Sequence, residues 1–238
     1  MQLLRSILYT AFMMLWVFAC GCVYFFICLA LPSRHRYRLA RFAARVVIGA
    51  LRPLCGLGYR IEGQENLPAG AHIALWKHSS TWETFAVMFV FPQQVWVLKR
   101  ELLWIPFVGW TLRLLHAIGI DRRSGPVAVH QILEQGARRL AEGSWVIVFP
   151  EGTRMPPGQT RKYGTSGALL AAKTGRLIVP VAHNAGYYWP RRGLLKKPGT
   201  IRVVIGKPID PTGRDPREIN AQVQSWIEGT VAKLAPAG

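Results

Sequence analysis

An apolar stretch from Ser6 to Leu31 places the strongest constraint on how this chain folds. At about 1.5 Å per residue, a helix of this length crosses a hydrocarbon core of about 30 Å. A signal peptide is the alternative, because Arg5 supplies the charged start that such peptides have. However, the stretch is longer than a signal peptide's apolar region, and no clear small-residue cleavage site ends it. The sequence therefore predicts an N-terminal membrane-anchoring helix.

Basic residues follow the apolar stretch directly. Five arginines lie between residues 34 and 45, whereas the N-terminal side offers only Arg5 and the amino terminus. This excess predicts that the domain after the anchor lies in the cytoplasm. From Arg38 to Leu54, apolar residues recur at helical spacing opposite an arginine-rich face. We expect this helix to lie in the membrane interface, with an ordinary surface helix packed on the domain as the alternative.

Composition indicates which kind of partner the chain binds. The 238 residues carry a formal net charge of +18, and half of them are hydrophobic. The charge implies an anionic partner, and the apolar excess favours a membrane lipid surface over nucleic acid. No zinc-finger spacing or RNA-binding aromatic motif is present, so no nucleic-acid partner is expected. The four cysteines form neither a disulfide framework nor a paired metal motif, so no metal site is expected.

Beyond residue 58, strand-like and helix-like segments alternate. The expected strands are Tyr59 to Glu62, Ile73 to Trp76, Val95 to Leu98, Ala117 to Ile120, Trp145 to Phe149, Leu177 to Val181 and Ile201 to Ile205. The expected helices are Thr81 to Phe91, Val127 to Glu142, Ser166 to Thr174 and a last helix that starts at Asp215. This alternation predicts a single layered α/β domain over residues 59–238, with a mostly parallel sheet flanked by helices. Residues 1–58 then form the membrane anchor and the basic amphipathic helix.

His78 lies between a predicted apolar strand and a predicted apolar helix, and Glu83 follows five residues later. The edge of an α/β sheet is where reactive groups are placed. A histidine with a carboxylate in reach can deprotonate a hydroxyl near neutral pH. The alternative for Glu83 is a capping box, in which Ser80 is the N-cap and Glu83 reaches back to its amide. From this segment alone the two interpretations remain equally open.

A second polar segment, Phe149-Pro-Glu-Gly-Thr-Arg154, also follows a strand-like run. Gly152 lets backbone approach a ligand closely, and Arg154 suits bidentate contacts with phosphate. Further short blocks stand at Lys99-Arg-Glu-Leu102, Gly119-Ile-Asp-Arg122 and Val179-Pro-Val181. Together with the His-x4-acid motif, these blocks resemble the glycerophospholipid acyltransferase family, specifically its 1-acylglycerol-3-phosphate acyltransferases. The blocks occur in the family's order. The acid in most members of the family is aspartate, and Glu83 resembles the bacterial branch that uses glutamate.

The resemblance implies roles for individual residues. His78 would be the general base, and Glu83 would orient its ring. The substrate would be bound by Lys99, Arg122, Glu151, Gly152, Thr153 and Arg154. Glu151 would orient the acceptor or the arginine pair. The alternative is a purely structural role, in which Glu151 is the buried partner of Arg154. Backbone amides near Gly152 are candidate donors to the oxyanion.

The resemblance also implies an activity and a location. The chain would transfer a fatty acyl group from a thioester, on acyl-carrier protein or coenzyme A, to the sn-2 hydroxyl of lysophosphatidate, without a cofactor. It would lie on the cytoplasmic face of a bacterial inner membrane. Two alternatives remain: another lysolipid acceptor, such as a lyso-ornithine lipid or a different lysophospholipid, and a non-catalytic membrane-anchored lipid-binding protein.

Overall fold

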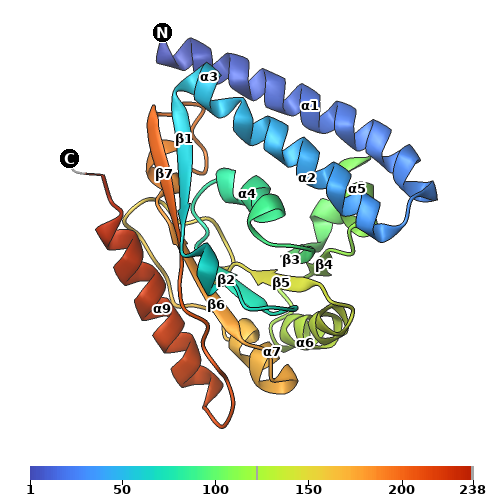
Figure 1. The fold of residues 1–238 in the computed structure, drawn as a ribbon, viewed down its shortest axis with the longest axis vertical. Helices are drawn as coiled ribbons and strands as arrows, with labels where there is room; N and C mark the ends of the chain where they lie inside the picture. Colours follow the sequence, from blue (N-terminus) through green and yellow to red (C-terminus); the bar gives the residue numbers. More distant parts are fainter. Residues whose placement is uncertain (122, 237–238) are drawn as a thin grey trace.

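A mostly parallel sheet lies between two layers of helices (Figure 1). The computed structural model describes residues 1–121 and 123–236, apart from the side chains of Leu29, Ser33 and Arg34. Within these residues the sheet has seven strands. They are β1 (Leu57–Glu62), β2 (Ile73–Trp76), β3 (Gln94–Lys99), β4 (Ile118–Ile120), β5 (Trp145–Val148), β6 (Ile178–His183) and β7 (Gly199–Ile205). All seven predicted strands are confirmed, with ends that shift by one or two residues.

The strand order is β1-β7-β6-β2-β5-β3-β4. Strands β2 to β6 run parallel to one another, β6 and β7 pair antiparallel, and β1 pairs parallel to β7. The predicted mostly parallel sheet is therefore confirmed. Because β2 lies between β5 and β6, the segments that follow these three parallel strands emerge at one edge of the sheet.

The helices follow the predicted start and stop signals. They are α1 (Gln2–Ala30), α2 (Ser33–Gly49), α3 (Leu51–Cys55), α4 (Trp82–Val90), α5 (Val108–Leu114), α6 (Pro126–Ala141), α7 (Ser166–Thr174), α8 (Ala185–Tyr188) and α9 (Pro216–Lys233), with short 3-10 turns η1 (Gln64–Asn66) and η2 (Arg100–Trp104). Helix α6 opens with Pro126 and stops before Gly143, whose φ is +82°. Asp215 caps α9, because its carboxylate accepts the Arg217 amide at 2.7 Å.

The two helical layers bury different faces of the sheet. Helices α6, α7 and α9 pack together on one side, and α1, α2, α4 and α5 pack together on the other (Figure 1). Strand β2 is wholly buried between the layers. Helix α7 approaches β2 so closely that a Cβ on Gly167 would lie 2.4 Å from the Leu75 side chain, so this position requires glycine.

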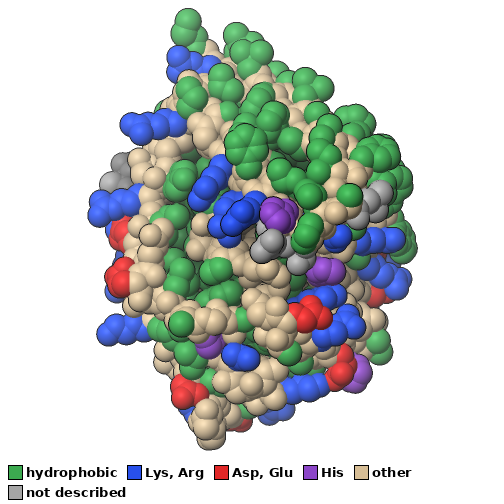
Figure 2. Space-filling model, turned by 45° about the vertical axis from the view of Figure 1, so that its right-hand side comes forward, with side chains coloured by type: hydrophobic (Ala, Val, Ile, Leu, Met, Phe, Trp, Pro, Cys, Tyr) green, Lys and Arg blue, Asp and Glu red, His purple; other side chains and the backbone are tan. Residues whose placement is uncertain are grey.

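Helix α1 is apolar on both its inner and its outer side. Its inner side buries Tyr9, Met13 and Tyr24 in the same core as the sheet, and the Tyr9 hydroxyl donates to the Val47 carbonyl at 3.1 Å. Its outer side exposes large hydrophobic side chains, namely Leu3, Leu4, Ile7, Leu8, Met14, Leu15, Phe18, Val23, Phe26 and Ile27. Figure 2 shows hydrophobic side chains gathered over the upper part of the molecule, where α1 lies. The stretch Gln2–Cys28 is long and apolar enough to cross a membrane, which indicates membrane association.

Helices α2 and α3 replace the single helix expected from Arg38 to Leu54. Helix α2 packs along α4, and Arg41 donates through Nη2 to the Pro92 carbonyl at 2.8 Å. The chain turns at Gly56, whose φ of +70° ends α3 and leads into β1. Helix α2 therefore covers one side of α4, which carries part of the site described next.

Candidate active site

His78 and the segment that follows β5 meet at the carboxyl edge of the sheet. This juxtaposition follows from topology, because β2 and β5 are parallel neighbours and each segment begins where its strand ends. The His78 amide donates to Glu151 Oε1 at 3.1 Å, and the Met155 amide donates to the His78 carbonyl at 2.7 Å. Both backbone polar groups of His78 are thus held by the loop after β5.

The His78 ring is held by Glu83. Its Nδ1 lies 2.9 Å from Glu83 Oε1, and the ring stacks on Phe149 with centroids 4.2 Å apart. The same Glu83 oxygen accepts the amides of Ser79 at 2.9 Å and Ser80 at 2.8 Å. Glu83 lies in the first turn of α4, where the helix dipole favours negative charge. One carboxylate therefore fixes both the start of the helix and the imidazole.

The ionisation of Glu83 depends on these donors. Burial is complete and by itself would raise the pKa of Glu83, but the hydrogen bond from His78, favourable electrostatic interactions with the His183 and His78 rings and the Ser80 amide hold it below the usual value. An ionised Glu83 that accepts from Nδ1–H leaves Nε2 of His78 as the proton-accepting nitrogen of the neutral ring. The capping and orienting interpretations are thus compatible in geometry, although Thr81, not Ser80, is the N-cap of α4.

His183, at the end of β6, lies behind the pair. Its Nε2 contacts the Lys77 carbonyl at 2.8 Å, and the Ala185 amide donates to its Nδ1 at 3.1 Å. These contacts require the neutral tautomer with hydrogen on Nε2. Burial lowers the pKa of His183, in keeping with a neutral ring. Sequence reasoning missed His183, although it follows the Val179-Pro-Val181 block by two residues on a strand that pairs with β2.

Glu151 is buried and lies against Lys77 and the backbone of His78. Its Oε1 lies 3.3 Å from Lys77 Nζ and accepts the His78 amide, and among the described residues no ion pair joins it to Arg154. The alternative in which Glu151 is the buried partner of Arg154 is therefore not seen among the described residues, and the role of Glu151 in orienting the acceptor stays a prediction. Burial raises the pKa of Glu151 to about 7, against the attraction of the Lys77 ammonium.

Arg154 stands beside His78 on a shared cavity wall. Its Nε is buried and has no hydrogen-bond partner among the described residues, and its carbonyl accepts from Arg191 Nη1 at 3.3 Å. A buried guanidinium nitrogen without an acceptor is rare and costly, so a ligand acceptor at this position is chemically reasonable. The predicted contact of Arg154 with phosphate stays a prediction.

Two other predicted substrate-binding residues, Lys99 and Thr153, do not line the cavity. Lys99 ends β3, is half-exposed, pairs with Glu101 at 3.5 Å and does not line the cavity. Thr153 is partly exposed in the turn before Arg154. Arg122 lies outside the described residues. The binding roles of these three side chains stay predictions.

Gly152 is required by the backbone conformation of the turn, and not by a close approach of other atoms to its Cα. Its φ is +68°, a left-handed conformation that favours glycine, and a Cβ there would meet no described atom within 4 Å. The Gly152 amide donates to the Phe149 carbonyl at 3.0 Å. This bond closes the turn, so the Gly152 amide itself is a poor candidate for the predicted oxyanion donor.

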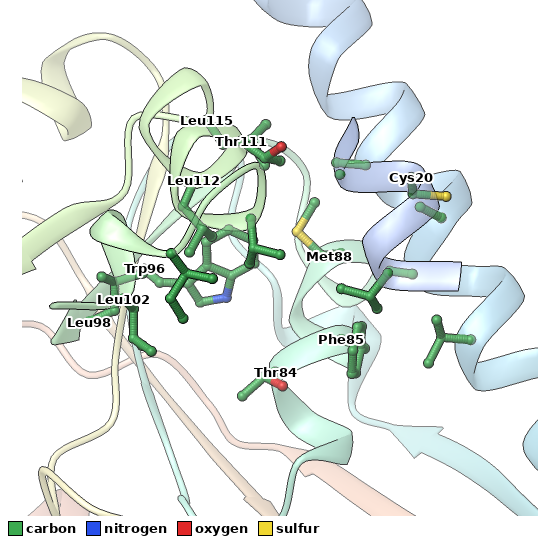
Figure 3. Close-up of a pocket in the computed structure, with 18 of the residues that line it drawn as sticks. Cys20, Thr84, Phe85, Met88, Trp96, Leu98, Leu102, Thr111, Leu112 and Leu115 are labelled. Atoms are coloured by element: carbon green, nitrogen blue, oxygen red, sulfur yellow. The ribbon is translucent and has the colours of Figure 1, made fainter. Parts of the chain in front are cut away.

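A cavity of about 380 Å³ opens from His78 and Arg154. Apart from these two residues its wall is almost wholly apolar, with contributions from α1, α2, α4, β3, η2 and α5. Figure 3 shows Thr84, Phe85 and Met88 of α4 on one side and Trp96 and Leu112 on the other. The apolar segment that follows Lys99 also lines the cavity, through Leu102, Ile105 and Val108. Such a space suits a long apolar group whose polar end lies at His78.

Comparisons with known proteins agree with this architecture. Residues 58–184 match the sequence profile of the family described as Acyltransferase. The chain is 42% identical to a Pseudomonas aeruginosa 1-acyl-sn-glycerol-3-phosphate acyltransferase, over 99% of this chain and 93% of the relative. It is 32% identical to a Limnanthes alba protein of the same name, over 74% of this chain and 63% of that relative. Its fold resembles the crystal structure of the Thermotoga maritima 1-acyl-sn-glycerophosphate acyltransferase PlsC, with a TM-score of 0.78, 24% identity and full coverage of both chains.

Proposed function

The chain belongs to the acyltransferase family, and from this membership we propose that it acylates the sn-2 hydroxyl of 1-acylglycerol-3-phosphate, giving phosphatidic acid. One observation carries the proposal beyond family membership. The imidazole of His78 and the guanidinium of Arg154 share one wall of an otherwise apolar cavity. A base, a phosphate-binding group and room for an acyl chain are the three requirements of this reaction.

The proposed chemistry begins at His78. Its Nε2 takes the proton of the acceptor hydroxyl while the hydroxyl oxygen attacks the thioester carbonyl carbon. Glu83, 2.9 Å from Nδ1, stabilises the imidazolium that forms. The tetrahedral intermediate then collapses: the carbon–sulfur bond breaks, the new ester remains, and the imidazolium returns its proton to the leaving thiolate. The attacking hydroxyl belongs to the substrate, so no acyl-enzyme is required.

Arg154 is proposed to bind the acceptor phosphate. A guanidinium offers several donors in a fixed fork, which matches phosphate oxygens. Its position beside His78 would place the sn-3 phosphate close to the base, with the sn-2 hydroxyl between them. Lys99 and Arg122 are proposed as further basic contacts, and Thr153 as a polar one.

The apolar cavity is proposed to hold a fatty acyl chain. Its wall combines side chains of the catalytic domain with side chains of α1 and α2, so the N-terminal helices complete the binding site. A cavity of this size falls within the range of ligand pockets. The donor is proposed to be a thioester of coenzyme A or of acyl-carrier protein. Since a thiolate leaves readily, the proposed reaction uses no cofactor.

The location is part of the same proposal. The exposed apolar side of α1 supports attachment to a membrane, which also holds the lipid substrate and product. The arginines that follow α1 favour the cytoplasmic face of a bacterial inner membrane.

The test is a direct assay of purified protein in mixed micelles. Lysophosphatidate is offered with acyl-coenzyme A and, separately, with acyl-carrier protein, and phosphatidic acid is measured by mass spectrometry. Lysophosphatidylcholine and a lyso-ornithine lipid serve as competing acceptors, and His78→Ala serves as the control. Preference for lysophosphatidate that depends on His78 is expected. Preference for an acceptor without a terminal phosphate would refute the proposed substrate, and absence of transfer to every acceptor would refute the activity.

A further inference from the structure

We infer that Glu228, on the C-terminal helix α9, is a positioning residue of the active site that acts through Lys77 and Glu151. The inference rests on the proposed function, because it concerns the same site. Glu228 lies outside residues 58–184, the part of the chain that matches the family profile. Neither Glu228 nor Lys77 lines the cavity, so their influence on the reaction has to be indirect.

The Lys77 ammonium is buried and held mainly by Glu228. Its Nζ donates to the two Glu228 carboxylate oxygens at 2.8 and 3.0 Å, and to the Gln159 carbonyl at 3.3 Å. The Tyr163 hydroxyl donates to Glu228 Oε1 at 2.5 Å and fixes the carboxylate from the other side. The Lys77 side chain is 3% exposed, so this charge needs its partner.

Glu151 is the second carboxylate near the same ammonium. Its Oε1 is 3.3 Å from Lys77 Nζ, longer than a charge-assisted hydrogen bond, and the same oxygen accepts the His78 amide at 3.1 Å. Glu228 therefore holds the ammonium away from Glu151 and leaves that oxygen for His78. Without the charge of Glu228, the ammonium would close on Glu151 and compete with the His78 amide for the oxygen.

The consequence falls on the catalytic base. Glu151 accepts the backbone amide of His78, and Glu83, five residues further along the chain, holds the His78 ring. Loosening the backbone at His78 would misplace the imidazole, and a displacement of about 1 Å can cost about 10²-fold in rate. Substrate binding should be spared, because the cluster lies behind the cavity wall. The expected signature is a fall in kcat without a matching change in KM.

The first test compares Glu228→Gln with Glu218→Gln. Both change a glutamate of α9 to its amide, but Glu218 is exposed, and among the described residues it makes no hydrogen bond or ion pair with this cluster. We expect Glu228→Gln to lower kcat about 10-fold to 100-fold, the range seen when a residue that supports a functional group from behind is changed. KM for donor and acceptor should stay near the wild-type values, and Glu218→Gln should match wild type. Tyr163→Phe, which keeps both charges, should show a smaller loss of kcat.

The second test does not depend on activity. Hydrogen–deuterium exchange is followed on the same preparations, well below their melting temperatures. The peptide that contains His78 to Ser80 should exchange faster in Glu228→Gln than in wild type or Glu218→Gln, while β5 stays protected. Tyr163→Phe supplies the comparison if Glu228→Gln does not fold.

The outcomes separate two failures. Unchanged kcat and unchanged exchange at His78, with only a lower melting temperature, would overturn the inference and leave Glu228 as a structural ion pair. A wild-type protein that transfers no acyl group refutes the proposed function instead, and the exchange measurement still decides whether Glu228 anchors His78.

Discussion

Replacing Glu83 with glutamine separates the role of its charge from the role of its hydrogen bonds. In the structure one oxygen, Oε1, accepts from the His78 ring and from the amides of Ser79 and Ser80. The other oxygen, Oε2, has no hydrogen-bond partner among the described residues and lies 3.9 Å from His183 Nε2. A glutamine can place its carbonyl at Oε1 and keep all three bonds. Its NH2 group then occupies the position of Oε2.

The expected loss of stability is modest. A hydrogen bond to a charged group contributes about 1.5–3 kcal/mol and one between neutral groups about 0.5–1.5 kcal/mol, so three weakened bonds cost a few kcal/mol before compensation. The complete burial of Glu83 offsets part of this cost, because the neutral amide is less penalised by desolvation than the carboxylate. A net cost of about 1–2 kcal/mol corresponds to a fall of roughly 2–8 °C in melting temperature for a chain of this size.

The expected loss of activity is far larger. The glutamine cannot offset the imidazolium charge that develops on His78 during proton transfer. In serine proteases the corresponding acid-to-amide change lowers kcat about 10⁴-fold, equivalent to about 5.4 kcal/mol of activation free energy. A stability loss of about 1–2 kcal/mol is small against the roughly 5–15 kcal/mol typical of folded domains, so the Glu83→Gln protein should be folded and nearly inactive. Glu83→Asp keeps the charge and should retain more activity than Glu83→Gln.

The measurement is a thermal melt and an initial acyl-transfer rate on the same three preparations. The exposed Glu134, which pairs with Lys173 on the surface, provides a matched control as Glu134→Gln. If Glu83→Gln transfers acyl groups at a rate near wild type and is only less stable, Glu83 is a helix cap, and the catalytic pair has to be abandoned.

Four further predictions follow from the same contacts. His78→Ala should lower kcat about 10²-fold to 10⁴-fold while the circular dichroism spectrum stays native, and near-normal turnover would exclude it as the base. Arg154→Ala should remove a charge-assisted contact of about 1.5–3 kcal/mol and lower kcat/KM for lysophosphatidate roughly 10-fold to 100-fold, while a loss confined to the donor would assign Arg154 elsewhere. Because the pKa of Glu151 is raised to about 7, its contribution to stability is full at low pH and is lost as the pH rises through 7. The melting temperature of wild type should therefore rise relative to Glu151→Gln between pH 8 and pH 5, and a constant difference would contradict the raised pKa. Protein held by insertion of α1 should stay in the membrane pellet after a high-salt wash, whereas release by salt would show that charge alone holds it.

The local elements could be predicted from the sequence because their causes are local. Strand β2 and helix α7 have the predicted limits, Ile73 to Trp76 and Ser166 to Thr174. Apolar runs, helical periodicity and capping residues act within a few positions along the chain, so the sequence displays them directly. The helix over Arg38 to Leu54 divides into α2 and α3, and α2 begins earlier, at Ser33. In this added part the Arg36 carbonyl accepts from the Tyr24 hydroxyl, and the Tyr37 hydroxyl donates to the Leu115 carbonyl, both contacts with residues distant in the chain.

The meeting of His78 with the segment after β5 could also be predicted from the sequence, because the expected parallel sheet places them at one edge. His78 and the segment after β5 each follow a buried strand, and parallel neighbours bring such segments to one edge. The pairing of His78 with Glu83 is likewise a short-range contact, across five residues. The sequence therefore determined that these candidate catalytic groups meet at one edge of the sheet, and their roles in the chemistry stay predictions.

Only the tertiary structure decided which groups surround this pair. Lys77 meets Glu228 across 151 residues of chain, which no periodicity or spacing reveals. The same packing turns Glu151 toward Lys77 in place of Arg154, leaves Lys99 half-exposed and brings α1 and α2 against α4 to enclose the cavity. Buried charges and cavity walls depend on every element that packs around them, so their partners emerge only once strand order and helix packing are set.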